Sequence, residues 1–513
     1  MANPSKFPDD VRPQSVWLAT AEMPRFEAAT GDLRADVVVV GGGLIGLTTA
    51  LLAADEGADV VVLEAGRIGS RTSGNTTGKV TAQHSLTYDE LVRRHGQDKA
   101  RLYADANQAG VEQVADLAET LGIECELIRT PAFAYTIDPG QVEKIEAEAK
   151  AAAELGLPAV LANPDEVGLP EVAAAVRFDN QVQIHPAQYL AGLARALIDE
   201  GVRVFENSRA VDVSESDGRV RVTTEGGAVV DAGHAVLATL LPIGMTGGYF
   251  ARTRPNRSYG IAVRLPEPPP EGMAISVDQQ TRSTRTWPGG GPNGLIVVGG
   301  GHETGTVEDT HGNYQGLIDW VGSTWNVADL TVEYRWSAQD YSTVDSIPYV
   351  GRTPESDTIL IATGMRKWGL SNGTAAAAVL RDLISGRDNP WSELYDARRI
   401  GGPRAVASMV KDNLKVGKEF AAGHLGRTLK GGVDHLEVGQ GGLLEVDGST
   451  VGAYRDHEGG LHTVSPICSH MGCALSWNTA DTSWDCACHG SRFDPDGKVL
   501  DGPATKPLKP GKS

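Results

Sequence analysis

DVVVVGGGLIGLTTALLAADEGADVVVLEAG, residues 36–66, is the stretch that decides the fold of the first part of the chain. The apolar run Asp36–Val40 predicts a buried strand, the glycines after it predict a tight turn, and the following residues predict a helix through about Glu56. Asp59–Leu63 is a second apolar run and predicts a second strand. This order of elements is typical of a parallel βαβ unit.

Gly41, Gly43 and Gly46 form the pattern G-x-G-x-x-G. The first glycine permits the turn, the second lets a pyrophosphate approach the backbone, and the third lets the helix pack on the strand. The helix N-terminus offers free N–H groups and the positive end of its dipole to phosphates. Glu64 follows the second strand, where an acid accepts hydrogen bonds from an adenosine ribose. A plain glycine-rich turn is the alternative, but the flanking strands and the terminal acid favour a dinucleotide site.

Length and charge bound the remaining possibilities. A chain of 513 residues predicts two to four domains, and 41% hydrophobic with 22% charged residues is typical of a globular protein. The net charge of −20 argues against binding to nucleic acid or to anionic membrane surfaces, which needs basic patches. Solubility is the simplest explanation of the acidity.

The sequence shows neither a signal peptide nor a membrane span. MANPSKFPDDVRP at the start has no apolar core, and the longest apolar stretch, Val37–Ala53, is interrupted by three consecutive glycines and two threonines. We therefore expect a cytoplasmic protein.

Three later segments decide between NAD and FAD. GRIGSRTSGNTTGKVTAQHS (66–85) is polar and suited to wrapping a long cofactor, and HAVLAT (234–239) predicts a strand that returns near the adenylate half. TILIATGMRKWGLSNGTAAAAVLRDLISG (358–386) predicts a strand ending at Gly364 and a helix beginning near Ser371–Thr374. The N-terminus of that helix would stabilise the negative charge of a reduced flavin.

The first 390 residues resemble the D-amino-acid oxidase/glycine oxidase superfamily through VVVVGGGLIG, DSIPYVGR (345–352) and ATGMRKWGLSNG. The resemblance implies bound FAD, oxidation of a C–N bond by hydride transfer, and an FAD domain interrupted by a substrate domain. No arginine pair for a substrate carboxylate stands out, which leaves open whether the substrate is an amine or an amino acid. The resemblance implies these FAD contacts: Gly41, Gly43, Leu44, Ile45, Gly46, Glu64, Ser73, Thr76, Thr77, Gly78, Lys79, Gly364, Met365, Gly369 and Leu370.

Three residues are candidates for catalysis. Lys367 and Trp368 lie in the predicted turn before Gly369 and should be close to the isoalloxazine ring. His84 follows the cofactor-wrapping segment. For each of the three, an exposed loop position or a packing role is the alternative.

The cysteines point to a metal site near the C-terminus. Four of the five fall between positions 468 and 488, whereas Cys125 stands alone in an apolar segment and is expected in the core. The four residues Cys468, His470, Cys486 and His489 form the boxes C-x-H and C-x-x-H, and each box supplies one thiolate and one imidazole. A Rieske [2Fe–2S] centre needs two of each. Two disulfides or a zinc site are alternatives, but disulfides need no histidines and zinc leaves two of six candidate ligands unused.

The C-terminal region resembles Rieske modules of the cytochrome bc and b6f type, including GSRFDPDGKVLDGPATKPL after the second box. We expect the two cysteines that the cluster leaves over, Cys473 and Cys488, to form a disulfide between the cluster loops. Ser491 is a candidate hydrogen-bond donor to a bridging sulfide. Asp456, His457 and His462 have a spacing found in non-haem iron sites, but Glu458-Gly459-Gly460 predicts a hairpin turn there instead.

We therefore predict an α/β Rossmann-like FAD-binding domain with an interleaved α+β substrate domain and a small all-β Rieske domain. The predicted function is oxidation of an amine-like or amino-acid-like small molecule by FAD, with relay through the cluster to an external one-electron acceptor, a redox protein or a quinone-like carrier. Electron flow from cluster to flavin, and a non-catalytic electron carrier or redox sensor, are the alternatives. The expected domains are 1–85, 181–245 and 341–386 (FAD); 86–180 and 246–340 (substrate); 387–432 (connector); and 433–513 (Rieske).

Overall fold

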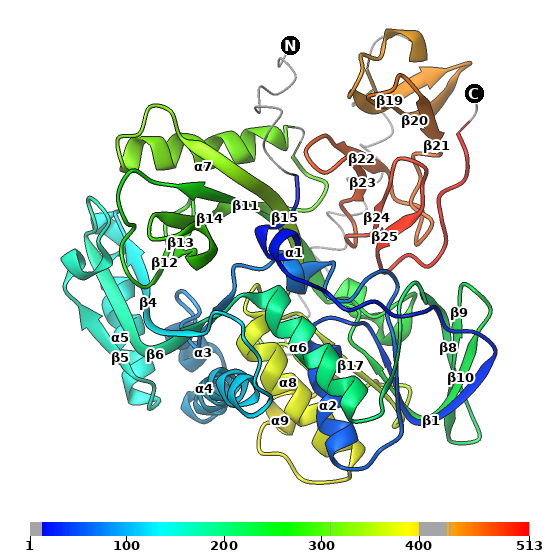
Figure 1. Cartoon of the computed structure of the whole chain (residues 1–513), viewed down its shortest axis with the longest axis horizontal. Helices are drawn as coiled ribbons and strands as arrows, with labels where there is room; N and C mark the ends of the chain where they lie inside the picture. Colours follow the sequence, from blue (N-terminus) through cyan, green and yellow to red (C-terminus); the bar gives the residue numbers. More distant parts are fainter. Residues whose placement is uncertain (1–12, 308, 400–427, 430–431, 512–513) are drawn as a thin grey trace.

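The computed structural model describes residues 13–307, 309–399, 428–429 and 432–511. Two large sheets with their helices form the body of the molecule, and a smaller β domain packs against one end of it (Figure 1). Most of the predicted connector, including 400–427, lies outside the described residues. Among the described helices, none is both long and apolar enough to cross a membrane.

The first sheet contains the glycine stretch 36–66. The strands of its central path are β16 (Tyr349–Arg352), β17 (Ile359–Thr363), β10 (Val229–Leu237), β1 (Asp32–Val40), β2 (Val60–Leu63) and β7 (Arg203–Phe205), in this spatial order. The pairs from β17 to β7 are parallel, as predicted for a βαβ fold. The hairpin β8 (Ala210–Ser216) and β9 (Arg219–Thr224) extends this sheet antiparallel beside β10.

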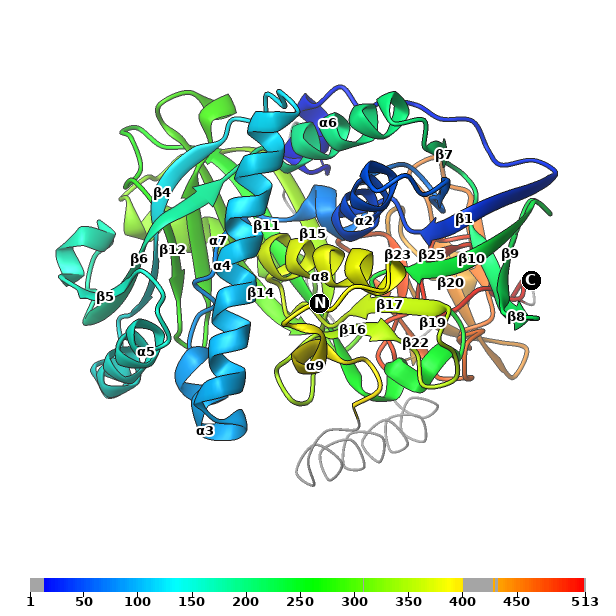
Figure 2. The same cartoon turned by 90° about the horizontal axis from the view of Figure 1, so that it is seen from below.

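Three helices pack together beside this sheet (Figure 2): α2 (Leu44–Asp55), α6 (Pro186–Asp199) and α8 (Gly369–Ile384). The alanine run in α8 has no bulky side chains, so α8 approaches α2 closely. The predicted helix start near Ser371–Thr374 was wrong. The helix begins at Gly369 without a side-chain cap, because Arg366 and Lys367 adopt left-handed backbone angles that turn the chain earlier.

The second sheet is mostly antiparallel. Its strands are β15 (Thr331–Thr343), β11 (Thr253–Arg264), β14 (Gly294–Glu303), β13 (Arg282–Thr286), β12 (Met273–Ser276), β4 (Ile128–Thr136), β6 (Ala174–Gln183) and β3 (Lys79–Val80), with β5 (Ala159–Ala162) beside β6. The helices α3 (Tyr88–His95), α4 (Gln97–Thr120), α5 (Val142–Glu154) and α7 (His311–Thr324) accompany it. The two large sheets meet where Ser342, at the end of β15, pairs with Met365.

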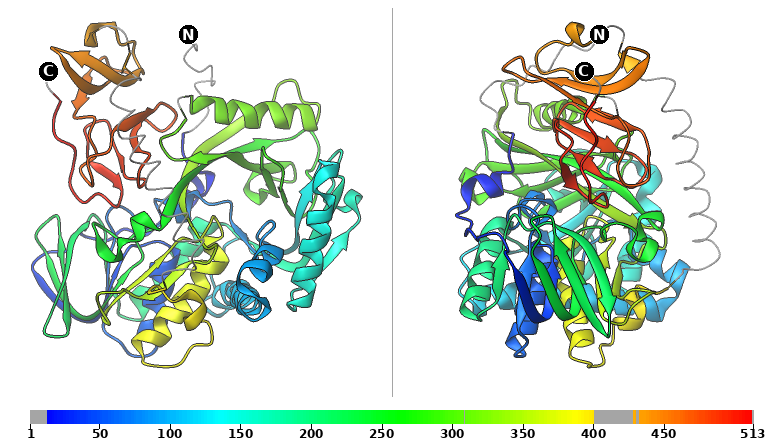
Figure 3. Two further views of the ribbon diagram at one scale, coloured as in Figure 1. Left: turned by 180° about the vertical axis from the view of Figure 1, so that it is seen from behind. Right: turned by 90° about the vertical axis from the view of Figure 1, so that its right-hand side faces the viewer.

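The C-terminal domain consists of two small sheets (Figure 3). One contains β18 (Thr428–Leu429), β19 (Gly441–Val446), β20 (Ser449–Arg455) and β21 (Leu461–Val464), and the other β22 (Leu475–Asn478), β23 (Ser483–Cys486), β24 (Arg492–Phe493) and β25 (Val499–Asp501). Trp477, Trp484 and Phe493 contribute to a hydrophobic core that is separate from those of the body. The predicted hairpin turn at 458–460 is confirmed between β20 and β21.

Two short helices complete the described fold, α1 (Val16–Thr20) and α9 (Ser392–Tyr395). Cys125 is buried as predicted, although it precedes β4 and is not in a strand. The strands of the first sheet come from 32–63, 203–237 and 349–363, which is consistent with an interrupted domain. The proposed domain boundaries themselves stay a prediction.

Candidate functional site

The glycine turn brings the end of β1 against the start of α2. Gly41 has a φ of 114°, and a Cβ there would lie 2.5 Å from the carbonyl oxygen of Ala238. A Cβ on Gly46 would lie 1.9 Å from the carbonyl oxygen of Gly41. Both positions therefore require glycine. Gly43, Leu44 and Ile45, at the start of α2, line a cavity beside the turn.

Two side chains complete this turn. Ser73 Oγ accepts a hydrogen bond from the Leu44 N–H at 3.1 Å, and Glu64 accepts from the N–H groups of Gly42 and Gly66 at 2.7 and 2.8 Å. Burial raises the pKa of Glu64, and the two backbone N–H groups oppose that effect. The acid is held in place at the end of β2, as a ribose contact requires.

The segment 72–78 is held by side chains from other parts of the chain. Ser15 Oγ donates to the Gly74 carbonyl at 2.6 Å, Trp17 Nε1 to the Thr76 carbonyl at 2.8 Å, and Trp336 Nε1 to the Asn75 carbonyl at 3.1 Å. Arg285, which is fully buried, donates to the carbonyls of Thr77, Gly78 and Ile184. These hydrogen bonds hold segment 72–78 in place, with its polar groups beside the glycine turn.

A cavity of about 270 Å³ runs from the glycine turn to the meeting point of the two sheets. It is lined by these predicted cofactor contacts: Gly41, Gly43, Leu44, Ile45, Glu64, Ser73, Thr76, Thr77, Met365, Gly369 and Leu370. Strands β11 and β15 contribute Ser258, Tyr259 and Asp340 to the far end. The segment 500–505 of the C-terminal domain supplies five further lining residues, so both parts of the chain enclose one cavity.

Four other predicted cofactor contacts lie outside this lining: Gly46, Gly78, Lys79 and Gly364. Lys79 Nζ donates to the Ala274 carbonyl at 2.8 Å and to Ser283 Oγ at 2.7 Å. Burial lowers its pKa well below the usual value. Lys79 therefore ties β3 to β12 and β13 in the second sheet.

Lys367 lies in the cavity wall on a strained turn. Both Arg366 and Lys367 have positive φ angles, 54° and 71°, which non-glycine residues adopt at a cost of about 1–3 kcal/mol each. The turn directs the Lys367 N–H to the Asp340 carboxylate and Nζ to Ser258 Oγ at 2.9 Å. Burial lowers the pKa of Lys367 and raises that of Asp340 to about 6. A cation and an anion thus share one end of the cavity.

His84 and Trp368 are stacked on each other behind the cavity wall, with ring centroids 4.7 Å apart, and neither lines the cavity. His84 Nδ1 contacts Tyr103 Oη at 2.9 Å, and Nε2 contacts Ser371 Oγ at 3.0 Å. Burial lowers the pKa of His84 to about 3. The ring is therefore neutral at physiological pH and supports the first turn of α8.

The four predicted cluster residues converge at one end of the C-terminal domain. Cys468 and Cys486 are buried with free thiols that share a hydrogen bond, and this bond lowers the pKa of the Cys468 thiol. The rings of His470 and His489 have centroids 5.2 Å apart.

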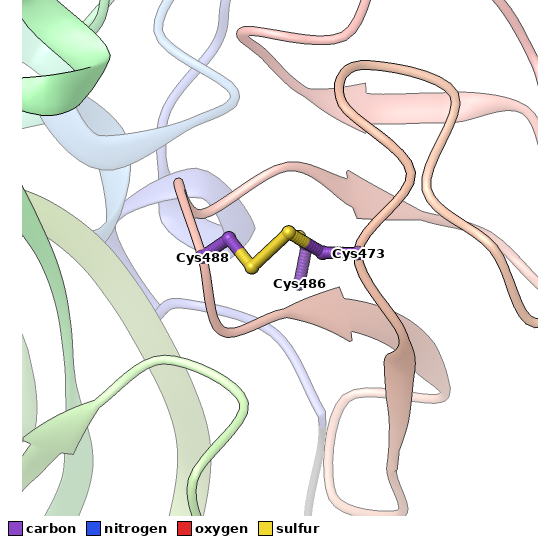
Figure 4. Close-up of side chains that lie close together, drawn as sticks. All are labelled: Cys473, Cys486 and Cys488. Carbon is purple, nitrogen blue, oxygen red and sulfur yellow. A yellow bond between two sulfur atoms is a disulfide. The ribbon is translucent and has the colours of Figure 1, made fainter. Parts of the chain in front are cut away.

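Cys473 and Cys488 form the predicted disulfide, with an S–S distance of 2.07 Å (Figure 4). The Cys486 sulfur lies within 4.8 Å of both sulfurs of this bond. The disulfide therefore joins the two cluster loops directly beside one of the predicted ligands.

The two histidines face the body of the molecule. His470 Nε2 lies 3.2 Å from the Gly244 carbonyl oxygen, while its buried Nδ1 has no hydrogen-bond partner in the described parts of the chain. Phe250 packs edge-on against both rings, with centroid distances of 5.1 Å to His470 and 4.9 Å to His489. The segment 243–252, which connects β10 to β11, thus covers the imidazole side of the site.

A hydrogen-bonded bridge joins the second cluster loop to β15. Tyr341 Oη donates to the His489 carbonyl at 3.0 Å, and Gln339 Nε2 donates to the Gly490 carbonyl at 2.8 Å. Gln339 also lines the cavity. Both residues are buried, so the cavity and the cluster loop are linked through one strand without exposure to solvent.

Sequence reasoning missed Asp340, Gln339, Tyr341, Gly244 and Phe250. Each stands in a strand or loop without a recognisable spacing pattern. The segment 500–505 belongs to the stretch after the second cluster box, which resembles Rieske modules. Its place in the cavity wall depends on domain packing, which the sequence does not show.

The fold and its two sites define a flavin-dependent oxidoreductase with its own iron–sulfur domain. The family model "FAD dependent oxidoreductase" (DAO) matches residues 36–383, and "Rieske [2Fe-2S] domain" matches residues 431–511. The chain therefore belongs to the DAO family of FAD-dependent oxidoreductases and carries a C-terminal Rieske domain. It binds FAD and a [2Fe–2S] cluster.

Several known proteins are similar to the chain. It is 34% identical to the putative Rieske 2Fe-2S iron-sulfur protein YhfW of Bacillus subtilis, over 97% of each chain. It is 26% identical to the gamma-glutamylputrescine oxidoreductase of Escherichia coli, over 72% of this chain and 88% of that one. The crystal structure of glycine oxidase from Geobacillus kaustophilus matches 72% of this chain and all of that one, with 20% identity and a TM-score of 0.61.

The residues present fit both cofactors. Gly43 and the start of α2 line the cavity. A Cβ at Gly43 would lie only 3.0 Å from Ser73 Oγ, so glycine is needed there to leave the backbone accessible to a pyrophosphate. At the cluster site, two buried thiols and the imidazoles of His470 and His489 make up the donor set of a Rieske centre. The buried Nδ1 of His470 has no hydrogen-bond partner among the described residues.

Proposed function

We propose that this chain is a dehydrogenase that oxidises a small amine or amino-acid-like substrate, and that its Rieske domain passes the electrons singly to an external acceptor. FAD supplies a hydride acceptor and the cluster a one-electron carrier. The observation that carries the proposal is the shared cavity, whose wall includes both Lys367 and the Rieske segment 500–505. We propose Cys468, His470, Cys486 and His489 as the cluster ligands.

The proposed substrate class is argued from the side chains of Lys367 and Asp340 at one end of the cavity. Two of the similar proteins, gamma-glutamylputrescine oxidoreductase and glycine oxidase, are named for amine-bearing small molecules. An ammonium group fits beside the buried Asp340 carboxylate, and an acidic group fits beside Lys367 Nζ. Because burial raises the pKa of Asp340 to about 6, this carboxylate is a stronger proton acceptor than an ordinary aspartate.

The bridge through β15 supports relay from the cavity to the cluster. Gln339 lines the cavity and donates to the Gly490 carbonyl, and Tyr341 donates to the carbonyl of the ligand candidate His489. Rieske centres have potentials of about −150 to +300 mV, generally above that of a free flavin. Transfer in this direction is therefore downhill, and a fused cluster would be redundant if the flavin gave both electrons to oxygen.

Anaerobic mixing of the purified holoenzyme with a panel of small amines and amino acids tests the substrate class. We expect at least one of them to bleach the flavin absorbance, and we expect the Asp340→Asn variant to bleach at least tenfold more slowly because it lacks the proton acceptor. Asp319→Asn, the same exchange on an exposed face of α7, is the matched control. If no amine or amino acid reduces the flavin, the proposed substrate class is wrong.

A further inference from the structure

A second cavity lies where the Rieske domain packs on the second sheet, and the proposed function does not use it. We call it the interdomain cavity, and its volume is about 470 Å³. Its wall comes from segment 13–18, from β11 and β15, and from segments 480–482 and 500–501 of the Rieske domain. It adjoins the flavin cavity, because Gln339 and Asp501 line both. Boundaries between domains are common places for small-molecule sites.

The charged side chains in the wall of the interdomain cavity are mostly basic. Among the described residues that line it, the charged ones are Arg71, Arg257, Arg335, Arg492, Asp481 and Asp501. The whole chain, in contrast, has 66 acidic and 46 basic residues. A guanidinium group donates paired hydrogen bonds to a carboxylate or a phosphate. An arginine-rich wall in an acidic protein therefore indicates a site for an anion with oxygen ligands.

The two aspartates of the wall bind two of the four arginines. Arg492 donates to Asp501 at 3.0 Å, and also to Asp485, which lies outside the wall, at 2.9 Å. Arg257 forms an ion pair with Asp481. These carboxylates are therefore already engaged by protein donors. Within the wall itself, four guanidinium groups face two carboxylates, which leaves an excess of two positive charges.

Arg257 has hydrogen-bond donors without a partner. Its side chain is only 2% exposed, and its Nη2 donates to Ser337 Oγ and to the Asp481 carboxylate. Its Nε and Nη1 are buried and have no hydrogen-bond partner in the part of the chain that the structure describes. Buried donors without an acceptor destabilise a fold. Because Arg257 lines the interdomain cavity, a ligand in this cavity is placed to supply an acceptor.

The other two arginines are held at the same cavity by different contacts. Arg335 on β15 lies over the Tyr314 ring, with its Cζ 5.5 Å from the ring centroid. Such stacking fixes the plane of a guanidinium group. Arg71 lies 3.9 Å from Asp501, which is the outer limit of an ion pair, and its side chain is 46% exposed. The four arginines come from segments that are far apart in the sequence, so only the docked arrangement of the domains brings them together.

We propose that the interdomain cavity binds a small oxyanion with two negative charges, a phosphate or a dicarboxylate, and that this ligand bridges the body and the Rieske domain. The two charges match the excess in the wall. Arg257 and Arg335 hold the anion from the body, and Arg492 holds it from the Rieske domain. The site is distinct from the pyrophosphate position, because the glycine turn 41–46 does not line it. The inference does not depend on amine oxidation.

Isothermal titration calorimetry of the holoenzyme tests the site, with inorganic phosphate, succinate or sodium chloride at equal ionic strength. Full FAD content is verified first, so that the pyrophosphate position is occupied. Arg335→Gln removes a donor on the body side, and Ala480→Glu adds a carboxylate on the Rieske side. Arg264→Gln is the matched control, because Arg264 also lies over a ring, that of Trp287 at 5.8 Å, but pairs with Glu333 outside the cavity.

We expect saturable binding of one dianion per chain and none of chloride. Either test variant should weaken this binding by about tenfold or more, while Arg264→Gln leaves it unchanged. Binding of phosphate alone assigns a phosphate-bearing ligand, and binding of succinate alone assigns a dicarboxylate; both results support the site. Heats equal to those of sodium chloride, or unchanged binding in both test variants, would overturn the proposal.

Thermal unfolding supplies a second measurement. A ligand that binds only the docked arrangement raises the unfolding temperature of the wild type. We expect the dianion that binds in calorimetry to give this rise, and we expect Ala480→Glu to lose it. An equal rise in the wild type and in both test variants would be a general effect of the salt and would contradict a site between the domains.

Discussion

The flavin cavity and the cluster site differ in how the chain builds them. The cavity takes its lining from segments between Val40 and Thr505, and each segment contributes a few residues where the two large sheets and the C-terminal domain pack together. The cluster site takes its four candidate ligands from two loops between 468 and 489, tied together by one disulfide. A site built from many segments responds to changes anywhere in the fold, whereas a site built from two loops responds mainly to its own residues.

Loss of a single candidate cluster ligand should distinguish the two sites most clearly, because it should empty the cluster site and leave the flavin bound. Cys486→Ala should reduce the iron content from about two per chain to almost none, because a Rieske centre needs all four ligands. The flavin should stay bound, since the cores of the two regions are separate. Iron analysis and the flavin absorption spectrum measure both effects, with Cys125→Ala as the control for loss of a buried thiol.

Simultaneous loss of iron and flavin in Cys486→Ala, with Cys125→Ala unaffected, would show that the cavity depends on an intact cluster loop. The comparison between a distributed site and a local one would then be wrong.

The reciprocal change is Gly46→Ala. The added Cβ would lie 1.9 Å from the Gly41 carbonyl oxygen, so the glycine turn must shift, at a cost of about 1–3 kcal/mol. We expect the variant to be purified with little FAD and with a full complement of iron. Gly226→Ala is the matched control, because a Cβ there meets no atom of the described residues within 4 Å. Normal FAD content in Gly46→Ala would contradict the assigned role of the turn.

The docking of the two regions can be weakened at a buried ion pair. Arg257 on β11 is 1% exposed and binds Asp481 of the Rieske domain, which also accepts from Ser337 Oγ at 2.7 Å. Arg257→Met should lower the free energy of unfolding by about 3–5 kcal/mol because it leaves a buried carboxylate without its main partner. Urea denaturation measures the loss. Arg129→Met, which breaks an exposed pair with Glu112, should cost about 1 kcal/mol or less.

This ion pair also makes the free energy of unfolding depend on pH. Burial alone would raise the pKa of Asp481, but Arg257 and Arg492 outweigh it and lower the pKa. A carboxylate with a lowered pKa stabilises the folded state above its unfolded pKa of about 3.9, and that stability disappears as the pH falls through the lower folded value. The difference in stability between wild type and Arg257→Met should therefore shrink in acid. A difference that stays constant from pH 7 to pH 3 would contradict this account.

Asp340, in the cavity, has a pKa shift in the opposite direction. Burial raises the pKa of Asp340 to about 6, so the ionised carboxylate reduces stability at neutral pH and this cost disappears as the pH falls below 6. Asp340→Asn should raise the free energy of unfolding at pH 7 by up to about 3 kcal/mol, with a smaller gain at pH 5. Slower flavin reduction together with higher stability would show that the carboxylate is needed for activity although it lowers the free energy of unfolding. A less stable Asp340→Asn variant at pH 7 would contradict the assignment.

The difference between the two sites also explains which of their residues could be predicted from the sequence. Cys468, His470, Cys486 and His489 could be predicted because their spacing is local, and the disulfide followed from the two cysteines left over. Lys79 was predicted as a cofactor contact, yet its Nζ bonds to Ala274 and Ser283 of the second sheet. The direction of a side chain at the end of a two-residue strand depends on its partners across the sheet, and the sequence does not show them.

The fold class could be predicted from residues 36–66 and the later motifs, since helix and strand periodicity is local. The contacts between regions could not. Tyr341 and Gln339 lie far along the chain from His489 and Gly490, and no spacing pattern relates them. The same is true of Phe250, whose contact with both cluster histidines follows only from domain packing.

The smallest expected effect concerns the bridge. Tyr341→Phe removes the hydrogen bond to the His489 carbonyl but keeps the ring, so we expect electron transfer between flavin and cluster to slow by a few-fold. The rate of flavin reduction by substrate should stay the same. Tyr395→Phe, a buried tyrosine bonded to Asn372 behind the cavity, is the matched control. An unchanged transfer rate would remove Tyr341 from the route.

The most direct test of relay from flavin to cluster is the order of reduction in one anaerobic stopped-flow experiment with a reactive amine. We expect the flavin absorbance to bleach first and the cluster to be reduced in a second phase. In a His489→Ala variant without the cluster, the flavin should bleach normally, but turnover with a one-electron acceptor should be slow. Reduction of the cluster before the flavin, or turnover of the cluster-free variant as fast as the wild type, would contradict this relay.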